Sequence, residues 1–250
     1  MLTIGSDEPD KKKIWVIARQ HPGETMAQWF IEGLLRQLLS SNESSRALLS
    51  SAVFYIVPNM NPDGSVRGNH RTNAAGSNLS RQWHETSKLM CPEVYFVRNA
   101  LHDKGVDIFS DIHGDEEIPY SFIMSGNSSK ALKKQADRFK STYMEANNNF
   151  QIALDYDSRK AAGVTACCGS NCGDKRNMST ATDYVAYHFN YLSLLLEIPY
   201  KSVATGTDSQ LSKPQNSNIE LGAPITKPLA DIISFNREEL PEVAPVTAAC

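Results

Sequence analysis

The stretch Ile14-Trp-Val-Ile-Ala18-Arg-Gln-His21-Pro-Gly-Glu24-Thr25 decides the fold. Its apolar first half predicts a buried strand, and the amphipathic pattern that follows predicts a helix over roughly 24–40. Pro22 and Gly23 suit a tight turn between them, on which the imidazole of His21 and the carboxylate of Glu24 can converge. A histidine and a glutamate are two of the three protein ligands in a His₂Glu zinc site. The alternative is a surface turn with two solvated side chains, so the chain must also supply a second histidine and a general base.

Strand and helix patterns alternate along the rest of the chain. Apolar runs predict strands at 52–57, 106–112, 121–124 and 191–198. Amphipathic runs predict helices over roughly 92–103, 130–147 and 219–236. The segments 59–82 and 158–180 lack a usable periodicity and read as loops. This alternation predicts a doubly wound α/β sheet, mixed but mostly parallel, with helices on both faces.

Composition narrows the class of protein. The 250-residue chain has a formal net charge of −3, which gives no reason to expect binding to nucleic acid or to an anionic membrane. No apolar stretch approaches the roughly 20 residues of a membrane span, and no secretory signal is recognisable. The 5 cysteines are an odd number, which favours free thiols in a reducing compartment over a disulfide framework. We therefore expect a cytoplasmic location.

Several polar residues fall where predicted strands end. His21, Glu24, His113 and Glu197 all lie at or just after such an end, and ligands of doubly wound sheets bind outside the carboxyl ends of the strands. His113 precedes a glycine, so its ring can lie at the rim of the sheet, although a capped core histidine fits the same pattern. Asp111 lies on the same face of that strand, where it either holds a ligand imidazole or accepts backbone hydrogen bonds.

One glutamate and three arginines are candidates for proton transfer and for binding a negatively charged group. Glu197 closes a strongly apolar strand, where a carboxylate is unfavourable unless it is paired or placed at a functional rim. Beside a bound metal it would be a general base, whereas the alternative is a strand-end residue pointing to solvent. Arg67, Arg71 and Arg81 crowd the predicted loop 59–82, and guanidinium groups there could clamp a carboxylate or stabilise an oxyanion.

Five motifs, in order and spacing, together resemble the M14-type zinc metallocarboxypeptidases, most closely their cytosolic-carboxypeptidase-like branch. They are Ala18-Arg-Gln-His21-Pro-Gly-Glu24-Thr25, Asn61-Pro-Asp-Gly64, Asn78-Leu-Ser-Arg81-Gln-Trp83, Asp111-Ile-His113-Gly-Asp-Glu116 and Leu196-Glu197-Ile-Pro199. The resemblance implies a zinc carboxypeptidase-like catalytic domain over residues 1–236, which leaves 237–250 as a disordered tail.

The resemblance also implies roles for individual residues. His21, Glu24 and His113 would bind Zn²⁺, and Glu197 would be the general base and acid. Arg71 would polarise the scissile carbonyl, and Arg81 would hold the C-terminal carboxylate of a peptide or protein substrate. Hydrolysis of a C-terminal peptide or isopeptide bond, including deglutamylation, is the implied activity.

The chain departs from the family pattern at three places. Ser80 stands where the family usually has asparagine, so we expect it to bind the substrate carboxylate more weakly or through water. Asn78 replaces an aspartate that is frequent in the family. About twenty residues precede His21, so we expect the sheet to lack N-terminal edge strands.

Two features of the family have only candidate residues here. Tyr184 and Tyr187 are candidates for the tyrosine that closes over substrate, by their proximity to Glu197. Lys175 and Arg176 could receive an acidic C-terminal side chain, or could simply be solvated.

Two alternative functions stay open at this point. One is a zinc amidohydrolase of the aspartoacylase or desuccinylase kind, which has similar zinc ligands and a similar glutamate. The other is a metal-binding but inactive interaction protein.

Overall fold

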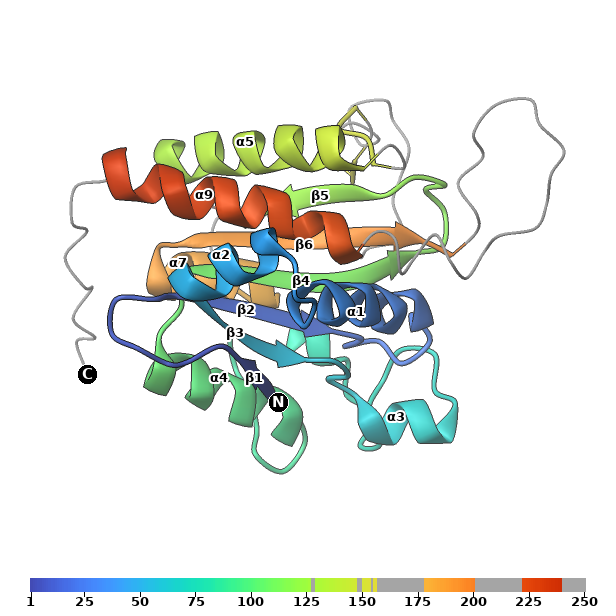
Figure 1. The fold of residues 1–250 in the computed structure, drawn as a ribbon. Coiled ribbons are helices and arrows are strands. Elements are labelled where there is room, and N and C mark those ends of the chain that lie inside the picture. The colour runs from blue at the N-terminus through green and yellow to red at the C-terminus, as the bar shows by residue number, and fades with distance from the viewer. Residues whose placement is uncertain (127–128, 148–149, 154, 157–177, 201–221, 240–250) are drawn as a thin grey trace, which may run out of the picture.

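A single mixed sheet of six strands forms the centre of the protein (Figure 1). The computed structural model describes residues 1–126, 129–147, 150–153, 155–156, 178–200 and 222–239. The strands are β1 (Leu2–Ile4), β2 (Lys12–Ala18), β3 (Ala52–Val57), β4 (Ile108–Asp115), β5 (Phe122–Ser125) and β6 (Leu192–Pro199). Their order in the sheet is β1-β3-β2-β4-β6-β5.

The central strands β3, β2, β4 and β6 are parallel, and the edge strands β1 and β5 are antiparallel to their neighbours. The prediction of a mixed, mostly parallel sheet is therefore confirmed. The sequence analysis expected the sheet to lack N-terminal edge strands, but the residues ahead of His21 supply one, β1, which pairs with β3. At three residues, β1 is too short to show an alternating pattern.

Helices cover both faces of the sheet (Figure 1). The helices, including two short 3₁₀ turns (η1 and η2), are α1 (Thr25–Leu38), α2 (Glu43–Ser51), α3 (Pro62–Arg67), η1 (Leu79–Arg81), α4 (Pro92–Lys104), α5 (Lys130–Ala146), α7 (Ala181–Phe189), η2 (Ala223–Ile225) and α9 (Thr226–Glu239). One core cluster joins the sheet to α1, α2, α5 and α9, and a second joins the opposite face to α4 and α7. Side chains of β2 alternate between the two, with Ile14 and Val16 in the first and Trp15 and Ile17 in the second.

The segment 59–82 contains short helices, so its prediction as a continuous loop was wrong. The Asn61 side chain caps α3 by accepting a hydrogen bond from the Gly64 amide at 3.0 Å. Pro62 occupies the first turn, and Gly68 ends the helix with a φ of +73°. These capping signals are local, whereas six residues are too few for a helical period to show.

The other helices differ in extent from their predictions. The sequence analysis did not predict α2 or α7, and α9 extends to Glu239, beyond the predicted end of the domain. The remaining tail, 240–250, lies outside the described residues, as do Lys175 and Arg176. None of the helices in the described part of the chain is long and apolar enough to cross a membrane.

Candidate active site

Parallel pairing brings the candidate residues to one edge of the sheet. The strands β2, β4 and β6 are neighbours and run in the same direction, so their carboxyl ends meet. His21 follows β2, His113 lies on β4, and Glu197 on β6 is the direct register partner of His113. Glu24 immediately precedes α1 and completes the group from the turn between β2 and that helix.

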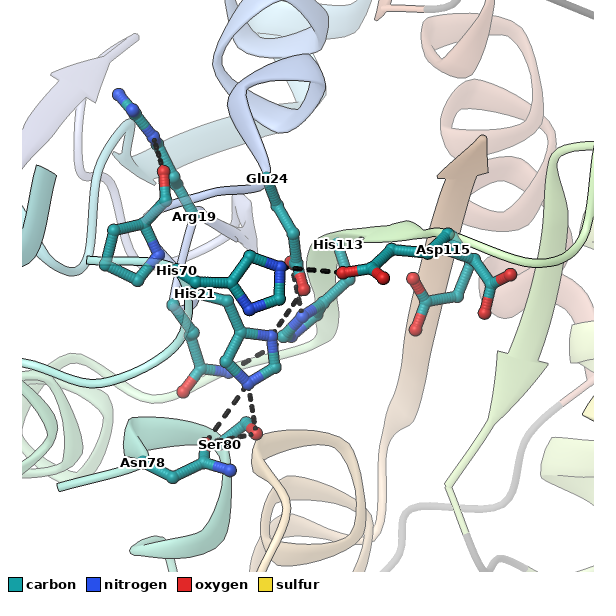
Figure 2. A network of polar contacts seen from close by, with 12 residues as sticks. Arg19, His21, Glu24, His70, Asn78, Ser80, His113 and Asp115 are labelled. Carbon is teal, nitrogen blue, oxygen red and sulfur yellow. Dashed lines mark hydrogen bonds and ion pairs between the residues drawn. The ribbon is translucent and has the colours of Figure 1, made fainter. Parts of the chain in front are cut away.

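His21, Glu24 and His113 form a buried cluster (Figure 2). One oxygen of Glu24, Oε1, lies 2.5 Å from Nδ1 of His21, and the other, Oε2, lies 3.0 Å from Nδ1 of His113. The three side chains offer ligand atoms that all lie within 4.8 Å of one another. Among the described residues, this is the one place where three or more histidine, cysteine or acidic side chains lie close enough together to hold a metal ion.

The electrostatics of the cluster favour an ionised glutamate. Burial alone would raise the pKa of Glu24, but the His113 and His21 imidazoles outweigh it and lower that pKa to about 2. Burial would lower the pKa of His113, but Asp111 and Glu24 outweigh this and raise it well above its ordinary value. Burial lowers the pKa of His21.

A chain of buried polar groups holds the far side of His113. Its Nε2 contacts Oδ2 of Asp111 at 2.9 Å, and Gln20 donates to the same oxygen at 2.6 Å. The indole of Trp83 in turn donates to Oε1 of Gln20 at 2.9 Å. Of the two possibilities for Asp111, the structure therefore shows contact with the imidazole, whose Nδ1 is left facing Glu24.

The far side of His21 is held by the segment around η1. Its Nε2 lies 2.8 Å from Oγ of Ser80 and 3.1 Å from Oδ1 of Asn78 (Figure 2). Arg81 donates through Nη1 to Oγ of Ser80 at 3.0 Å and to the Ser80 carbonyl at 3.1 Å. Asn78 and Ser80, two of the three departures from the family pattern, thus both contact the same imidazole.

Glu197 is buried next to the cluster. Burial raises the pKa of its carboxyl to about 8. The hydroxyl of Tyr156 lies 3.2 Å from Oε1 of Glu197 and 2.6 Å from Oδ2 of Asp115, and its single proton can be donated to either carboxylate. Sequence reasoning missed Tyr156, which is 41 residues from Glu197 and follows no recognisable motif.

The predicted arginines divide into two groups. Arg71 is half-buried, and its positive charge contributes to lowering the pKa of His21, which places it near the cluster. Its neighbour His70 contacts Glu116 at 2.6 Å on the exposed rim (Figure 2). Arg67 is exposed and donates to the carbonyl of Ala74 at 3.5 Å, so its described contact does not involve the site.

The two candidate tyrosines contact other residues. The Tyr184 hydroxyl is buried in the second core cluster and lies 2.8 Å from Nε2 of His102. Tyr187 is 65% exposed on the same helix, α7. In the described part of the chain it is Tyr156, and neither of these, that contacts Glu197.

A buried cluster of two histidines and one glutamate, with a further carboxylate beside it, is typical of metal-dependent hydrolases. Residues 1–213 match the zinc carboxypeptidase family, to which this chain belongs.

Three individual proteins illustrate what the chain is similar to. An uncharacterized protein of Zymomonas mobilis is 37% identical over 93% of this chain and 58% of its own length. A metallo-carboxypeptidase from Pseudomonas aeruginosa, solved in complex with (2-guanidinoethylmercapto)succinic acid, is 35% identical with a TM-score of 0.80, over 93% of this chain and 60% of its own. Cytosolic carboxypeptidase 1 of Gallus gallus is 43% identical over 35% of this chain and 7% of its own. The chain thus spans about three fifths of the first two relatives.

Proposed function

We propose that this protein is a zinc-dependent metallocarboxypeptidase that hydrolyses the C-terminal peptide or isopeptide bond of a peptide or protein. The observation that carries the proposal is the shared carboxylate of Glu24, whose two oxygens face Nδ1 of His21 and Nδ1 of His113. Family membership supports this function over a zinc amidohydrolase of the aspartoacylase kind.

The donor set fits zinc. Two imidazole nitrogens and one carboxylate are the ligands of His₂Glu catalytic sites, which leave a position open for water or substrate. Their outer nitrogens are held by Ser80, Asn78 and Asp111, so the rings are oriented without the metal. Zn²⁺ in this site would supply Lewis-acid polarisation of a carbonyl oxygen and would acidify water.

The other residues would handle protons and charge. Glu197 would accept a proton from the attacking water and return it to the leaving amine, a role that its pKa of about 8 suits near neutral pH. Arg71, whose charge already acts on the cluster, would stabilise negative charge on the scissile carbonyl oxygen. Arg81 would bind the substrate's C-terminal carboxylate, because a guanidinium group pairs with a carboxylate through two parallel hydrogen bonds.

The substrate class rests on the same residues. The ligand named for the Pseudomonas aeruginosa relative is a dicarboxylic acid, which supports a site built to bind a free carboxylate. Deglutamylation would require a cation for the acidic side chain, and a cytoplasmic location would give access to intracellular protein C-termini. We propose deglutamylation as one activity of this site and the cytoplasm as the location of the protein.

A peptide panel tests the function. Purified protein is loaded with zinc and incubated with peptides that differ in their C-terminal residue, with N-acyl amino acids in parallel. We expect release of the C-terminal residue that a chelator abolishes and added zinc restores. Hydrolysis of N-acyl amino acids alone would indicate an amidohydrolase, and one zinc per chain without turnover would indicate an inactive interaction protein.

A further inference from the structure

The hydroxyl of Ser80 contacts three polar side chains at once. They are His21 through Nε2 at 2.8 Å, Arg81 through Nη1 at 3.0 Å and Asn78 through Oδ1 at 3.0 Å. We propose that Ser80 is a positioning residue that joins the metal ligand His21 to the substrate anchor Arg81, and that it does not itself contact substrate. This inference rests on the proposed function.

The donors and acceptors around Ser80 fit this role. Nδ1 of His21 faces Glu24 at 2.5 Å, and if it is to bind a metal the ring proton must lie on Nε2, which then donates to Ser80. Arg81 has only donors, so it also donates to the Ser80 oxygen. The hydroxyl proton is left for Oδ1 of Asn78.

This arrangement uses the whole hydrogen-bonding capacity of the side chain. A serine hydroxyl has one proton to donate and two lone pairs to accept with, and each is matched here. A substrate carboxylate needs a donor, and Ser80 has none left to offer. Ser80 is also only 3% exposed. An asparagine amide would bring two N–H donors to this position. Serine lacks them, but its hydroxyl oxygen accepts hydrogen bonds from both His21 and Arg81 and so connects the two residues.

The bridge makes zinc binding and carboxylate recognition depend on one hydroxyl. Among the contacts that the described residues make, the outer nitrogen of His21 would then keep Asn78 at 3.1 Å, and Arg81 would lose its hydrogen bond to the Ser80 hydroxyl. Removing an outer partner of a metal ligand typically weakens metal affinity about 10- to 100-fold.

The test compares Ser80→Ala with Ser80→Thr, which keeps the hydroxyl, and with Ser45→Ala. Ser45 is a matched control because its hydroxyl is also buried and donates to a backbone carbonyl, that of Gln37, in a different part of the molecule. Zinc affinity is measured by competition with a chromophoric chelator, and KM and kcat are measured on a C-terminal peptide at saturating zinc.

We expect Ser80→Ala to weaken zinc binding about tenfold or more and to raise KM several-fold, with kcat within about threefold of wild type. Ser80→Thr should restore zinc affinity to within about threefold. A raised KM in Ser80→Ala, with zinc affinity equal to that of Ser45→Ala, would show that Ser80 is a substrate contact and would overturn the inference alone. Absence of both zinc binding and turnover in the wild type would overturn the proposed function with it.

Discussion

Glu197 and His113 are register partners across the parallel pair β4–β6. Neighbouring strands lie about 4.8 Å apart, so the two side chains are held beside each other by the sheet itself, without a loop between them. The carboxylate proposed as general base is therefore fixed relative to a proposed metal ligand. Because the sheet fixes it, its removal should affect catalysis without displacing the metal.

Glu197→Gln should lower kcat by about 10²- to 10⁴-fold, because the amide cannot accept and return a proton. Zinc content should not change, since Glu197 is outside the cluster formed by His21, Glu24 and His113. Steady-state kinetics and metal analysis of the same preparation check both statements. A variant that keeps its zinc and its kcat would exclude Glu197 as the base.

The metal-free protein should lose stability in acid through Glu24. Its pKa is lowered to about 2 in the folded state from an ordinary value of 4.5. A lowered pKa means that the stabilisation is complete above about pH 4.5 and is lost as the pH falls toward 2. It is on the order of 3 kcal/mol.

Urea denaturation of metal-free wild type and Glu24→Gln between pH 2 and pH 7 measures this contribution. The difference in unfolding free energy should favour the wild type at neutral pH and should disappear in acid. A difference that does not change with pH would contradict the assignment.

Arg81→Met should raise KM for a C-terminal peptide about 10- to 100-fold, which is the effect of losing a charged hydrogen bond worth about 1.5–3 kcal/mol. The rise in KM should occur only for peptides that have a free C-terminal carboxylate. Wild type should strongly prefer a peptide with a free C-terminus to its amide, and Arg81→Met should discriminate less. Unchanged discrimination would indicate that another residue binds the carboxylate.

Tyr156→Phe should shift the pH profile of kcat/KM to higher pH. The Tyr156 hydroxyl contacts Oε1 of Glu197 at 3.2 Å, and this hydrogen bond acts to lower the pKa of Glu197. Its loss lets the pKa rise further above the ordinary value, so a higher pH is needed to ionise the base. The rate should fall by roughly fivefold to tenfold, as expected for one hydrogen bond of about 1 kcal/mol. A profile that overlays the wild type would argue against this contact.

The residues at the edge of the sheet could be predicted from the sequence, because the position of the site in a doubly wound sheet follows from the topology: it lies at the carboxyl ends of the parallel strands. His21, His113 and Glu197 follow or end apolar runs, and the runs belong to adjacent parallel strands, so their ends meet. The contacts that orient them could not be predicted in the same way. Trp83 and Gln20 are 63 residues apart, and no local period relates them.

Trp83→Phe tests whether that distant contact matters for the metal site. The substitution removes the indole N–H that donates to Gln20 and leaves a buried acceptor unpaired, which should lower the unfolding free energy by about 1–3 kcal/mol. Gln20 also donates to Asp111, which contacts His113, so the loss should extend to zinc affinity.

Trp15→Phe is the matched control for this prediction. Trp15 is equally buried in the same hydrophobic core cluster. Its one indole N–H donates to the carbonyl of Gly105 at 2.9 Å and is therefore not part of the polar chain behind His113. Urea denaturation should show similar destabilisation of both variants, whereas chelator competition should show weaker zinc binding, by several-fold, in Trp83→Phe alone. Equal zinc affinity in the two variants would mean that Asp111 keeps its position without Gln20, and that the orientation of His113 is set by the strand and not by the polar chain behind it.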